Sequence, residues 1–155
     1  MTVGKLVKAA LATATAVAAV SFAAPTPAQA DGVQVTCGTN VTTRGFGLYY
    51  NSGNKGSKRC IRGSVYNYGS NPDTCSSRGC APYYFEYDGR TGQGESVKNQ
   101  AASAYNYDAY HEYIVYFNSG FGGPGDQVSA YGLGGWYRDL GNTYNNNASQ
   151  NVFDL

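Results

Sequence analysis

Residues 116–123 read YFNSGFGG, and residues 49–56 read YYNSGNKG. The two stretches share a pair of aromatic residues, an Asn-Ser-Gly turn and a final glycine. Aromatic residues favour strands, whereas asparagine and glycine accept the positive φ of a tight turn, so each stretch predicts a β-hairpin. The repeat therefore predicts a protein that is built from two related β-units.

Two further blocks recur in the same order along the chain, and each keeps its residue types in both copies. They are residues 64–66 (SVY, followed by Gly69) with 129–131 (SAY, followed by Gly134), and residues 99–103 (NQAAS) with 145–149 (NNNAS). The first copy is longer by about 21 residues, which fall at about residues 70–92. Short runs rich in Tyr, Phe, Val and Ile, such as residues 46–51, 83–87 and 113–118, predict the strands.

The spacing aromatic-x4-aromatic-x-Gly, given by Tyr116, Phe121 and Gly123, resembles the folded hairpin of a βγ-crystallin Greek-key motif. The resemblance implies an all-β, βγ-crystallin-like sandwich of two Greek-key motifs, with a disulfide-closed insertion in the first. In the first copy Asn54 stands where the second aromatic residue belongs, so we expect its hairpin to be less tightly packed. The implied ranges are about residues 45–104 for the first motif and about residues 113–153 for the second.

Residues 1–30 are typical of a secretory signal peptide. Two lysines precede an apolar stretch at residues 9–24, and residues 28–30 (AQA) form an A-x-A cleavage site. The apolar stretch is shorter than the roughly 20 residues that span a bilayer. We therefore expect cleavage after residue 30 and a secreted, extracellular domain at residues 31–155 with no membrane attachment.

The composition of the 155-residue chain excludes several classes of protein. Only 14% of residues are charged and the formal net charge is +1, so a basic nucleic-acid-binding domain is excluded. The 21 glycines and 15 tyrosines favour a turn-rich β-protein over a coiled coil, which would be rich in Ala, Glu, Lys and Leu. The aromatic side chains also supply the apolar surface that a disordered chain lacks.

Four cysteines, Cys37, Cys60, Cys75 and Cys80, all follow the expected cleavage site. In an oxidising compartment their even number predicts two disulfides. A zinc site would need closely paired cysteines or several histidines, and the chain has one histidine. Four cysteines allow three pairings. Cys75 and Cys80 are near enough in sequence for a local bridge, which would leave Cys37 to pair with Cys60, while the other two pairings stay open.

The leader, the cysteines and the repeated blocks together make the chain resemble the secreted peptidase inhibitors of actinobacteria, whose founding activity is inhibition of a metalloproteinase. The resemblance covers roughly residues 46–153. It implies a monomeric protein that is not an enzyme, needs no cofactor and binds an extracellular protease through a rigid loop. The arginine between the last two cysteines suits a protease pocket or a carboxylate. The candidate contact residues are Ser76, Ser77, Arg78 and Gly79.

A non-inhibitory module is the alternative: a weak calcium binder, a cell-wall binder or a killer-toxin-like antimicrobial protein. Crystallin-like motifs often carry an (Asn/Asp)-(Asn/Asp)-x-x-(Ser/Thr)-Ser stretch that binds calcium. Residues 145–150 (NNNASQ) resemble it except at the last place, and residues 99–104 (NQAASA) depart at the second and last places. Neither copy has a carboxylate, so we expect weak calcium binding at most, with the amide and hydroxyl groups serving the turns instead. The candidate ligands are Asn99, Ser103, Asn145, Asn146 and Ser149.

Two other groups of residues have side chains that can carry chemistry. His111 lies three residues after Asp108, as in part of a catalytic triad, but the chain has no G-x-S-x-G elbow, and a surface histidine at a strand edge is the favoured interpretation. Glu86 and Asp88 would project from one face of a strand at residues 83–88, where solvated charges are favoured over a glycosidase pair. The many tyrosines pack the sandwich and leave room for an exposed patch that binds sugars or polymers.

Overall fold

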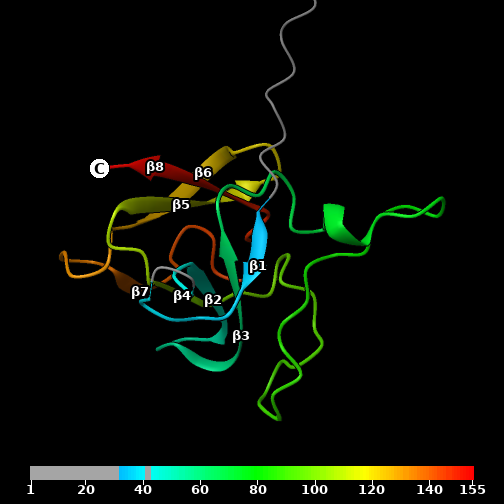
Figure 1. The fold of residues 1–155 in the computed structure, drawn as a ribbon, viewed down its shortest axis with the longest axis horizontal. Coiled ribbons are helices and arrows are strands. Elements are labelled where there is room, and N and C mark those ends of the chain that lie inside the picture. The colour runs from blue at the N-terminus through cyan, green and yellow to red at the C-terminus, as the bar shows by residue number, and fades with distance from the viewer. Residues whose placement is uncertain (1–31, 41–42) are drawn as a thin grey trace, which may run out of the picture.

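Two antiparallel sheets pack against each other around one core (Figure 1). They are seen in a computed structural model that describes residues 32–40 and 43–155, so the signal peptide predicted for residues 1–30 lies outside the described residues. The first sheet has the strand order β1-β3-β2-β4-β7 and the second has the order β6-β5-β8. The elements are β1 (Val33–Val35), β2 (Phe46–Asn51), β3 (Lys55–Arg62), the 3-10 turn η1 (Pro72–Thr74), β4 (Ser103–Asn106), β5 (His111–Asn118), β6 (Gly122–Val128), β7 (Tyr137–Asp139) and β8 (Ser149–Asp154).

Both predicted hairpins are confirmed, and they match each other closely. The hairpins β2–β3 and β5–β6 each contain a register shift, which falls between Tyr49 and Asn51 in the first and between Tyr116 and Asn118 in the second. Their turns pass through the left-handed region at equivalent places. These are Gly53, Asn54 and Gly56 in the first hairpin (φ 67°, 56° and 74°) and Gly120, Phe121 and Gly123 in the second (φ 78°, 60° and 78°).

The two units exchange segments between the sheets. β7 belongs to the second unit but pairs with β4 of the first, with Ala104 opposite Arg138. In return, Val65 of the first unit exchanges both backbone hydrogen bonds with Gln150 of β8. The first sheet therefore holds β1 to β4 together with β7 of the second unit, and the second sheet holds β5, β6 and β8 together with the Val65 segment of the first unit, which makes the molecule a double Greek key.

A buried serine stabilises each hairpin turn in the same way. The Ser103 hydroxyl accepts a hydrogen bond from the amide of Asn54 (2.9 Å) and donates one to the carbonyl of Asn51 (2.7 Å). The matching bonds in the second unit run from the Phe121 amide to the Ser149 hydroxyl (3.1 Å) and from that hydroxyl to the Asn118 carbonyl (2.7 Å). The third repeated block is therefore structurally equivalent in the two units.

The middle repeated block, in contrast, is not equivalent in the two units, and the prediction that it would be is wrong. Residues 64–66 form the exchanged segment, whereas residues 129–131 follow β6 in a loop and the exchanged segment of the second unit is β7. The second unit therefore has the longer connection at this point, and the insertion of the first unit lies between Tyr68 and Asn99. A match of three residues was too short to set the alignment.

The insertion contributes to the core, which sequence analysis did not predict. Tyr83, Phe85 and Val97 are buried in it, and the Tyr83 hydroxyl donates a hydrogen bond to the carbonyl of Gly32 (2.9 Å). The strand predicted at residues 83–87 is absent, because only an isolated bridge joins Tyr84 to the opposite segment. Tyr83 and Phe85 are buried and Tyr84 is exposed, as a strand would have them, but the alternation ends there because Tyr87 is 82% exposed.

Aromatic rings from both sheets form the centre of the core. The ring of Phe46 in β2 stacks on Tyr113 in β5, with 4.6 Å between centroids and an interplanar angle of 13°. Burial raises the pKa of the Tyr113 hydroxyl to about 12. Each fully buried large side chain stabilises the fold by about 1.5–3 kcal/mol. The other buried members are Leu48, Ile61, Val65, Tyr68, Tyr83, Phe85, Val97, Ala101, Ala104, Val115, Val128 and Leu140.

Two disulfides are present, with Cys37 bonded to Cys60 and Cys75 bonded to Cys80. This is the pairing that the spacing of the cysteines favours. The first disulfide joins the chain after β1 to β3, and the second closes a loop in the insertion. Within residues 32–40 and 43–155, no helix is long and apolar enough to cross a membrane.

Candidate functional site: the disulfide-closed arm

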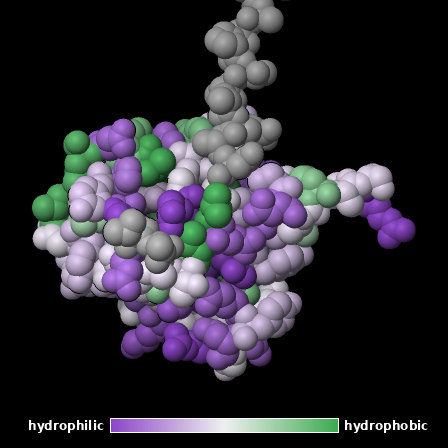
Figure 2. Space-filling model, in the orientation of Figure 1, coloured by the Kyte–Doolittle hydropathy of each residue, from purple (hydrophilic) through white to green (hydrophobic). Residues whose placement is uncertain are grey.

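The segment Pro72–Cys80, which we call the arm, projects from the side of the sandwich. It is the green extension at the right of Figure 1, and in Figure 2 it stands clear of the body with a strongly hydrophilic residue at its tip. Every residue from 72 to 79 is exposed. The arm is therefore free to contact a partner.

The tip of the arm is a tight hairpin that the Cys75–Cys80 disulfide closes. The Ser76 amide donates to the Gly79 carbonyl and the Gly79 amide donates to the Ser76 carbonyl, each at 3.0 Å. The Arg78 amide also donates to the Ser76 hydroxyl, at 3.2 Å. Gly79 has a φ of 104°, which other residues rarely adopt. The Cα atoms of the two cysteines are 3.9 Å apart, so the disulfide and the backbone hydrogen bonds together restrict the conformation of the loop.

The base of the arm is fixed by a buried asparagine. Asn71 donates its amide to the carbonyl of Ala81 (2.7 Å), and its side-chain oxygen caps η1 by accepting from the amide of Asp73 (3.1 Å). The Thr74 hydroxyl donates to the Asn71 carbonyl (2.8 Å) and accepts from the amide of Ala81 (2.9 Å). These bonds connect the two ends of the arm, so it is held at the base as well as at the tip.

Arg78 gives the arm a charged group that can bind a partner. It lies in the turn between Ser76 and Gly79, and its guanidinium makes no ion pair with any residue that the structure describes. A guanidinium presents a planar set of donors that matches a carboxylate. The predicted contact residues Ser76, Ser77, Arg78 and Gly79 are all exposed at the tip of the arm.

The residues predicted as weak calcium ligands serve the turns of the fold, through hydrogen bonds or through their backbone conformation. Both candidate hydroxyls, of Ser103 and Ser149, are buried and engaged in the hairpin turns. Asn99 and Asn145 are exposed at left-handed positions (φ 62° and 50°), and Asn146 donates to a neighbouring carbonyl. Among the described residues, no group of three or more acidic, histidine or cysteine side chains is arranged so that it could hold a metal ion. This donor set, neutral and largely occupied, does not fit a tight calcium site.

The third block contains one residue whose importance was missed. Asn147 is fully buried and joins the two units, because its side-chain oxygen accepts from the amide of Ala101 (2.9 Å) and its side-chain nitrogen donates to the carbonyl of Val97 (2.8 Å). The first unit has alanine at the matching place in the repeat. This difference, one of two between the copies of the block, is the signal in the sequence that points to this role.

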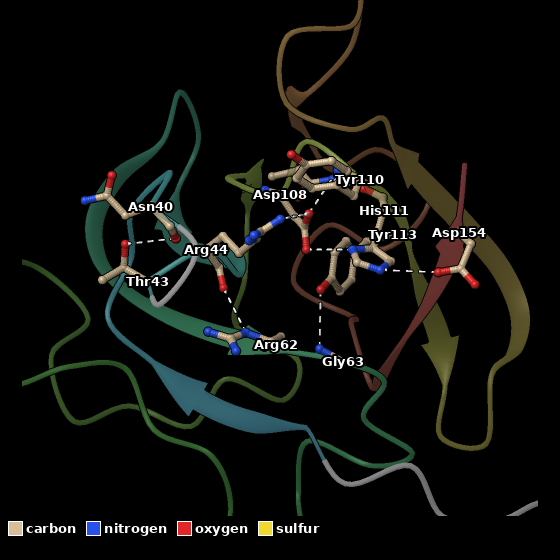
Figure 3. Close-up of polar contacts among 11 residues, drawn as sticks. Asn40, Thr43, Arg44, Arg62, Gly63, Asp108, Tyr110, His111, Tyr113 and Asp154 are labelled. Atoms are coloured by element: carbon tan, nitrogen blue, oxygen red, sulfur yellow. Dashed lines mark hydrogen bonds and ion pairs between the residues drawn. The ribbon is translucent and has the colours of Figure 1, made fainter.

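His111 lies between two carboxylates, as Figure 3 shows. Its Nδ1 is 2.8 Å from Asp108, which is buried, and its Nε2 is 3.2 Å from Asp154, which is exposed. Arg44 approaches the same buried carboxylate at 3.9 Å, and its guanidinium lies 4.7 Å from the ring centre of Tyr110. A carboxylate occupies the side of the imidazole where a triad would need a nucleophile. The cluster supports the connection between β4 and β5.

Glu86 and Asp88 do not form a pair on a strand face, because residues 83–88 do not form a strand. Asp88 accepts a hydrogen bond from the hydroxyl of Ser57 and lies 3.8 Å from the guanidinium of Arg90. The hydrogen bond from Ser57 is the main reason why the pKa of Asp88 is lowered. Asp88 therefore connects the insertion to β3.

Equivalent hairpins, exchanged segments and a shared core define a βγ-crystallin-like double Greek-key protein. A solved structure described as "Evolution of the eye lens beta-gamma-crystallin domain fold" aligns with 80% of this chain and 98% of that chain, at a TM-score of 0.47 and 11% identity. Neither a family model nor a curated protein matches the chain. The fold class therefore rests on the strand order, and inhibition of a peptidase is a separate proposal.

Proposed function

We propose that the protein is a secreted inhibitor that binds an extracellular protease through the arm. The observation that carries the proposal is a closed, exposed hairpin with an unpaired arginine at its turn, held at both ends. A loop that is ordered before binding loses little conformational entropy when a partner docks. The disulfides fit export to an oxidising compartment, in agreement with the predicted signal peptide.

The proposed inhibitor acts by occupying the active-site cleft of the protease and needs no catalytic group of its own. Arg78 enters an acidic pocket or pairs with a carboxylate beside the protease active site, while the backbone of Ser76 and Ser77 lines the cleft. The family resemblance points to metalloproteinases as the first targets, and the arginine adds proteases with an acidic specificity pocket. One monomer binds one protease.

The test is inhibition of a protease panel by the mature chain, residues 31–155, with both disulfides formed. The panel holds a thermolysin-type zinc protease, a trypsin-type and a subtilisin-type serine protease. We expect inhibition of at least one, a loss of at least about tenfold with Arg78→Ala, and a further loss when Cys75 and Cys80 are both replaced by Ser.

Arg90→Ala is the matched control, because Arg90 is an exposed arginine of the same insertion outside the arm. Circular dichroism and thermal unfolding establish that each variant is folded. Inhibition that survives both changes in the arm, in folded protein, would place the contact elsewhere. Absence of inhibition across the panel would overturn the proposal.

A further inference from the structure

Five aromatic side chains meet at the end of the first sheet, and we call them the aromatic platform: Tyr105, Tyr107, Tyr131, Trp136 and Tyr137. Tyr105 is the central ring, with ring centroids 4.2 Å from Tyr107, 4.7 Å from Trp136 and 6.4 Å from Tyr137. Tyr131 and Tyr137 remain 37% and 56% exposed. Rings that only filled a core would not leave this much area in solvent.

The platform lies on the outer face of the sheet. Ala104 and Leu48 point into the core, so Tyr105 and Gly47 face outward, and register places Gly47 opposite Tyr105 and Tyr105 opposite Tyr137. A Cβ on Gly47 would lie 3.1 Å from the ring of Tyr107. The glycine therefore leaves room for that ring to lie against the sheet.

Several contacts hold the platform rigid. The hydroxyls of Tyr49 and Tyr107 are hydrogen-bonded at 2.5 Å, and the Trp136 carbonyl accepts from the amide of Asn106 at 2.8 Å. Burial is the largest cause of the raised pKa of Tyr105 and of Tyr49. These two hydroxyls therefore stay uncharged at ordinary pH, and the hydrogen bonds fix the position of the rings.

A shallow polar groove of about 530 Å³ adjoins the platform along the loop before β7 and β7 itself. Gln127, Ser129, Arg138 and Asp139 line it and offer both donors and acceptors of hydrogen bonds. The charge of Arg138 is balanced, because its guanidinium lies 3.5 Å from the carboxylate of Asp126. Flat rings beside a polar groove without excess charge do not favour a nucleic acid or a strongly charged peptide.

We infer that the aromatic platform binds a neutral polysaccharide. A sugar ring has one face of C–H groups, which pack on the negative face of an aromatic ring, and an edge of hydroxyls, which hydrogen-bond to polar side chains. The platform and the groove supply these two kinds of contact side by side. Tyr137 and Tyr131 stack on the sugar, while Gln127 and Asp139 bind its hydroxyls.

The platform and the arm lie at opposite ends of the molecule. In Figure 1, β7 is at the left and the arm is at the right, across the longest dimension. A polysaccharide on the platform would therefore leave the arm accessible. The platform does not depend on the proposed inhibition, and each site is tested by a different measurement.

The experiment is binding of the mature protein to insoluble cellulose and insoluble chitin, together with fluorescence titration by cellohexaose and chitohexaose. Trp136 is the only tryptophan of the chain, so its emission reports the platform directly. We expect retention on at least one polymer that persists at about 1 M salt, where charge attraction is screened. We also expect a saturable change in Trp136 emission with the matching oligosaccharide.

Tyr137→Ala removes an exposed ring and should weaken binding at least about tenfold, whereas Tyr137→Phe keeps the ring and should retain most of it. Tyr87→Ala is the control, because Tyr87 is an 82% exposed tyrosine of the insertion, away from the platform. The inference fails if neither polymer retains the protein, or if Tyr137→Ala and Tyr87→Ala bind equally well. Self-association that Tyr137→Ala abolishes would instead make the platform a contact between copies and would also overturn it.

Discussion

The two hairpins have the same backbone, yet they hold different residues at the same strained position. Asn54 and Phe121 both have φ near 60°, where asparagine is common and a bulky aromatic residue is rare. Phe121 packs its ring against Tyr66, with 5.6 Å between centroids, and against Tyr116, at 6.2 Å. In the second hairpin, packing therefore outweighs backbone preference.

The first hairpin obtains its aromatic contact from another part of the chain. Asn54 has no ring, and its side-chain oxygen is buried without a hydrogen-bond partner. The insertion instead brings Phe85 against Tyr50, with ring centroids 5.6 Å apart, and brings the Thr91 carbonyl to the amide of Ser57 (2.8 Å). The comparison teaches that the two hairpins are packed at different places: the insertion supplies a ring at Tyr50, which matches Phe117, whereas the second hairpin makes its own contact between Tyr116 and Phe121.

The largest expected effect concerns the feature that the hairpins share. Ser103→Ala and Ser149→Ala each remove a hydroxyl that bonds two turn groups, so each should lower the free energy of unfolding by about 2–4 kcal/mol. Urea unfolding measures both losses. Ser52→Ala in the first turn is the control and should change little. If only one of the two variants lost stability, the two serines would be equivalent in position but not in their contribution to the free energy of unfolding.

The next effect tests the position where the hairpins differ. Phe121→Asn should cost about 2 kcal/mol, because the lost ring contacts outweigh the relief of a residue at positive φ. Asn54→Gly should be neutral or stabilise by up to about 1 kcal/mol, because it removes the buried oxygen without a partner. Thermal unfolding compares the two variants. Equal destabilisation by both would contradict the proposed division of roles.

A smaller effect concerns the pH dependence of stability, to which the second unit should contribute through a carboxylate that the first unit lacks. Asp126 belongs to the second unit, and Arg59 holds the matching place in the first. Burial opposes ionisation of Asp126, but hydrogen bonds from Thr143, Gly141 and Asn142 together outweigh it and lower the pKa. A lowered pKa means that the ionised carboxylate stabilises the fold above the unfolded value of about 3.9 and that this is lost as pH falls through the folded value.

Asp126→Asn should therefore be less stable than the parent protein at pH 6, by on the order of 1 kcal/mol, and the gap should narrow toward pH 2. Urea midpoints at the two pH values give the comparison. Glu95→Gln serves as the reference, because Glu95 is exposed and its carboxylate makes no hydrogen bond or ion pair with any residue that the structure describes. If the difference in stability between Asp126→Asn and the parent protein did not change with pH, the charge of Asp126 would not contribute to the stability of the fold.

The smallest effect concerns calcium. The third block of each unit offers neutral donors, and its hydroxyls are already bonded. Unfolding temperatures in about 2 mM calcium and in chelator should differ by less than about 2 °C. A larger rise, abolished by Asn145→Ala but not by Asn99→Ala, would reveal a calcium site in the second unit alone.

The sequence predicts the parts of the fold that local chemistry controls. Aromatic and Asn-Ser-Gly residues define both hairpins, and the serine of the third block recurs because each turn needs the same hydroxyl. Residues 64–66 were misaligned because three ordinary strand residues carry little positional information. The role of the insertion in the core, through Tyr83 and Phe85, depends on long-range packing that no local pattern encodes.

The two proposed sites also differ in how far the sequence predicts them. The arm is visible from the spacing of Cys75 and Cys80, because a disulfide across a short loop is a local constraint. The aromatic platform is not visible, because Tyr105 and Tyr137 are neighbours only after the second unit contributes β7 to the first sheet. Composition alone indicated that some tyrosines would be exposed, without indicating which.

That exchange of segments also makes the two units depend on each other. A single unit has a hairpin and two more segments, and one of those segments completes the sheet of the other unit. Alone, it would expose an unpaired sheet edge, which favours pairing with another chain. Two identical units could each pair the open sheet edge of the other by exchanging this segment across a twofold axis. The same exchange brings Tyr105 of the first unit beside Tyr137 of the second, so the platform exists only where the two units are joined, whereas the arm belongs to the first unit alone.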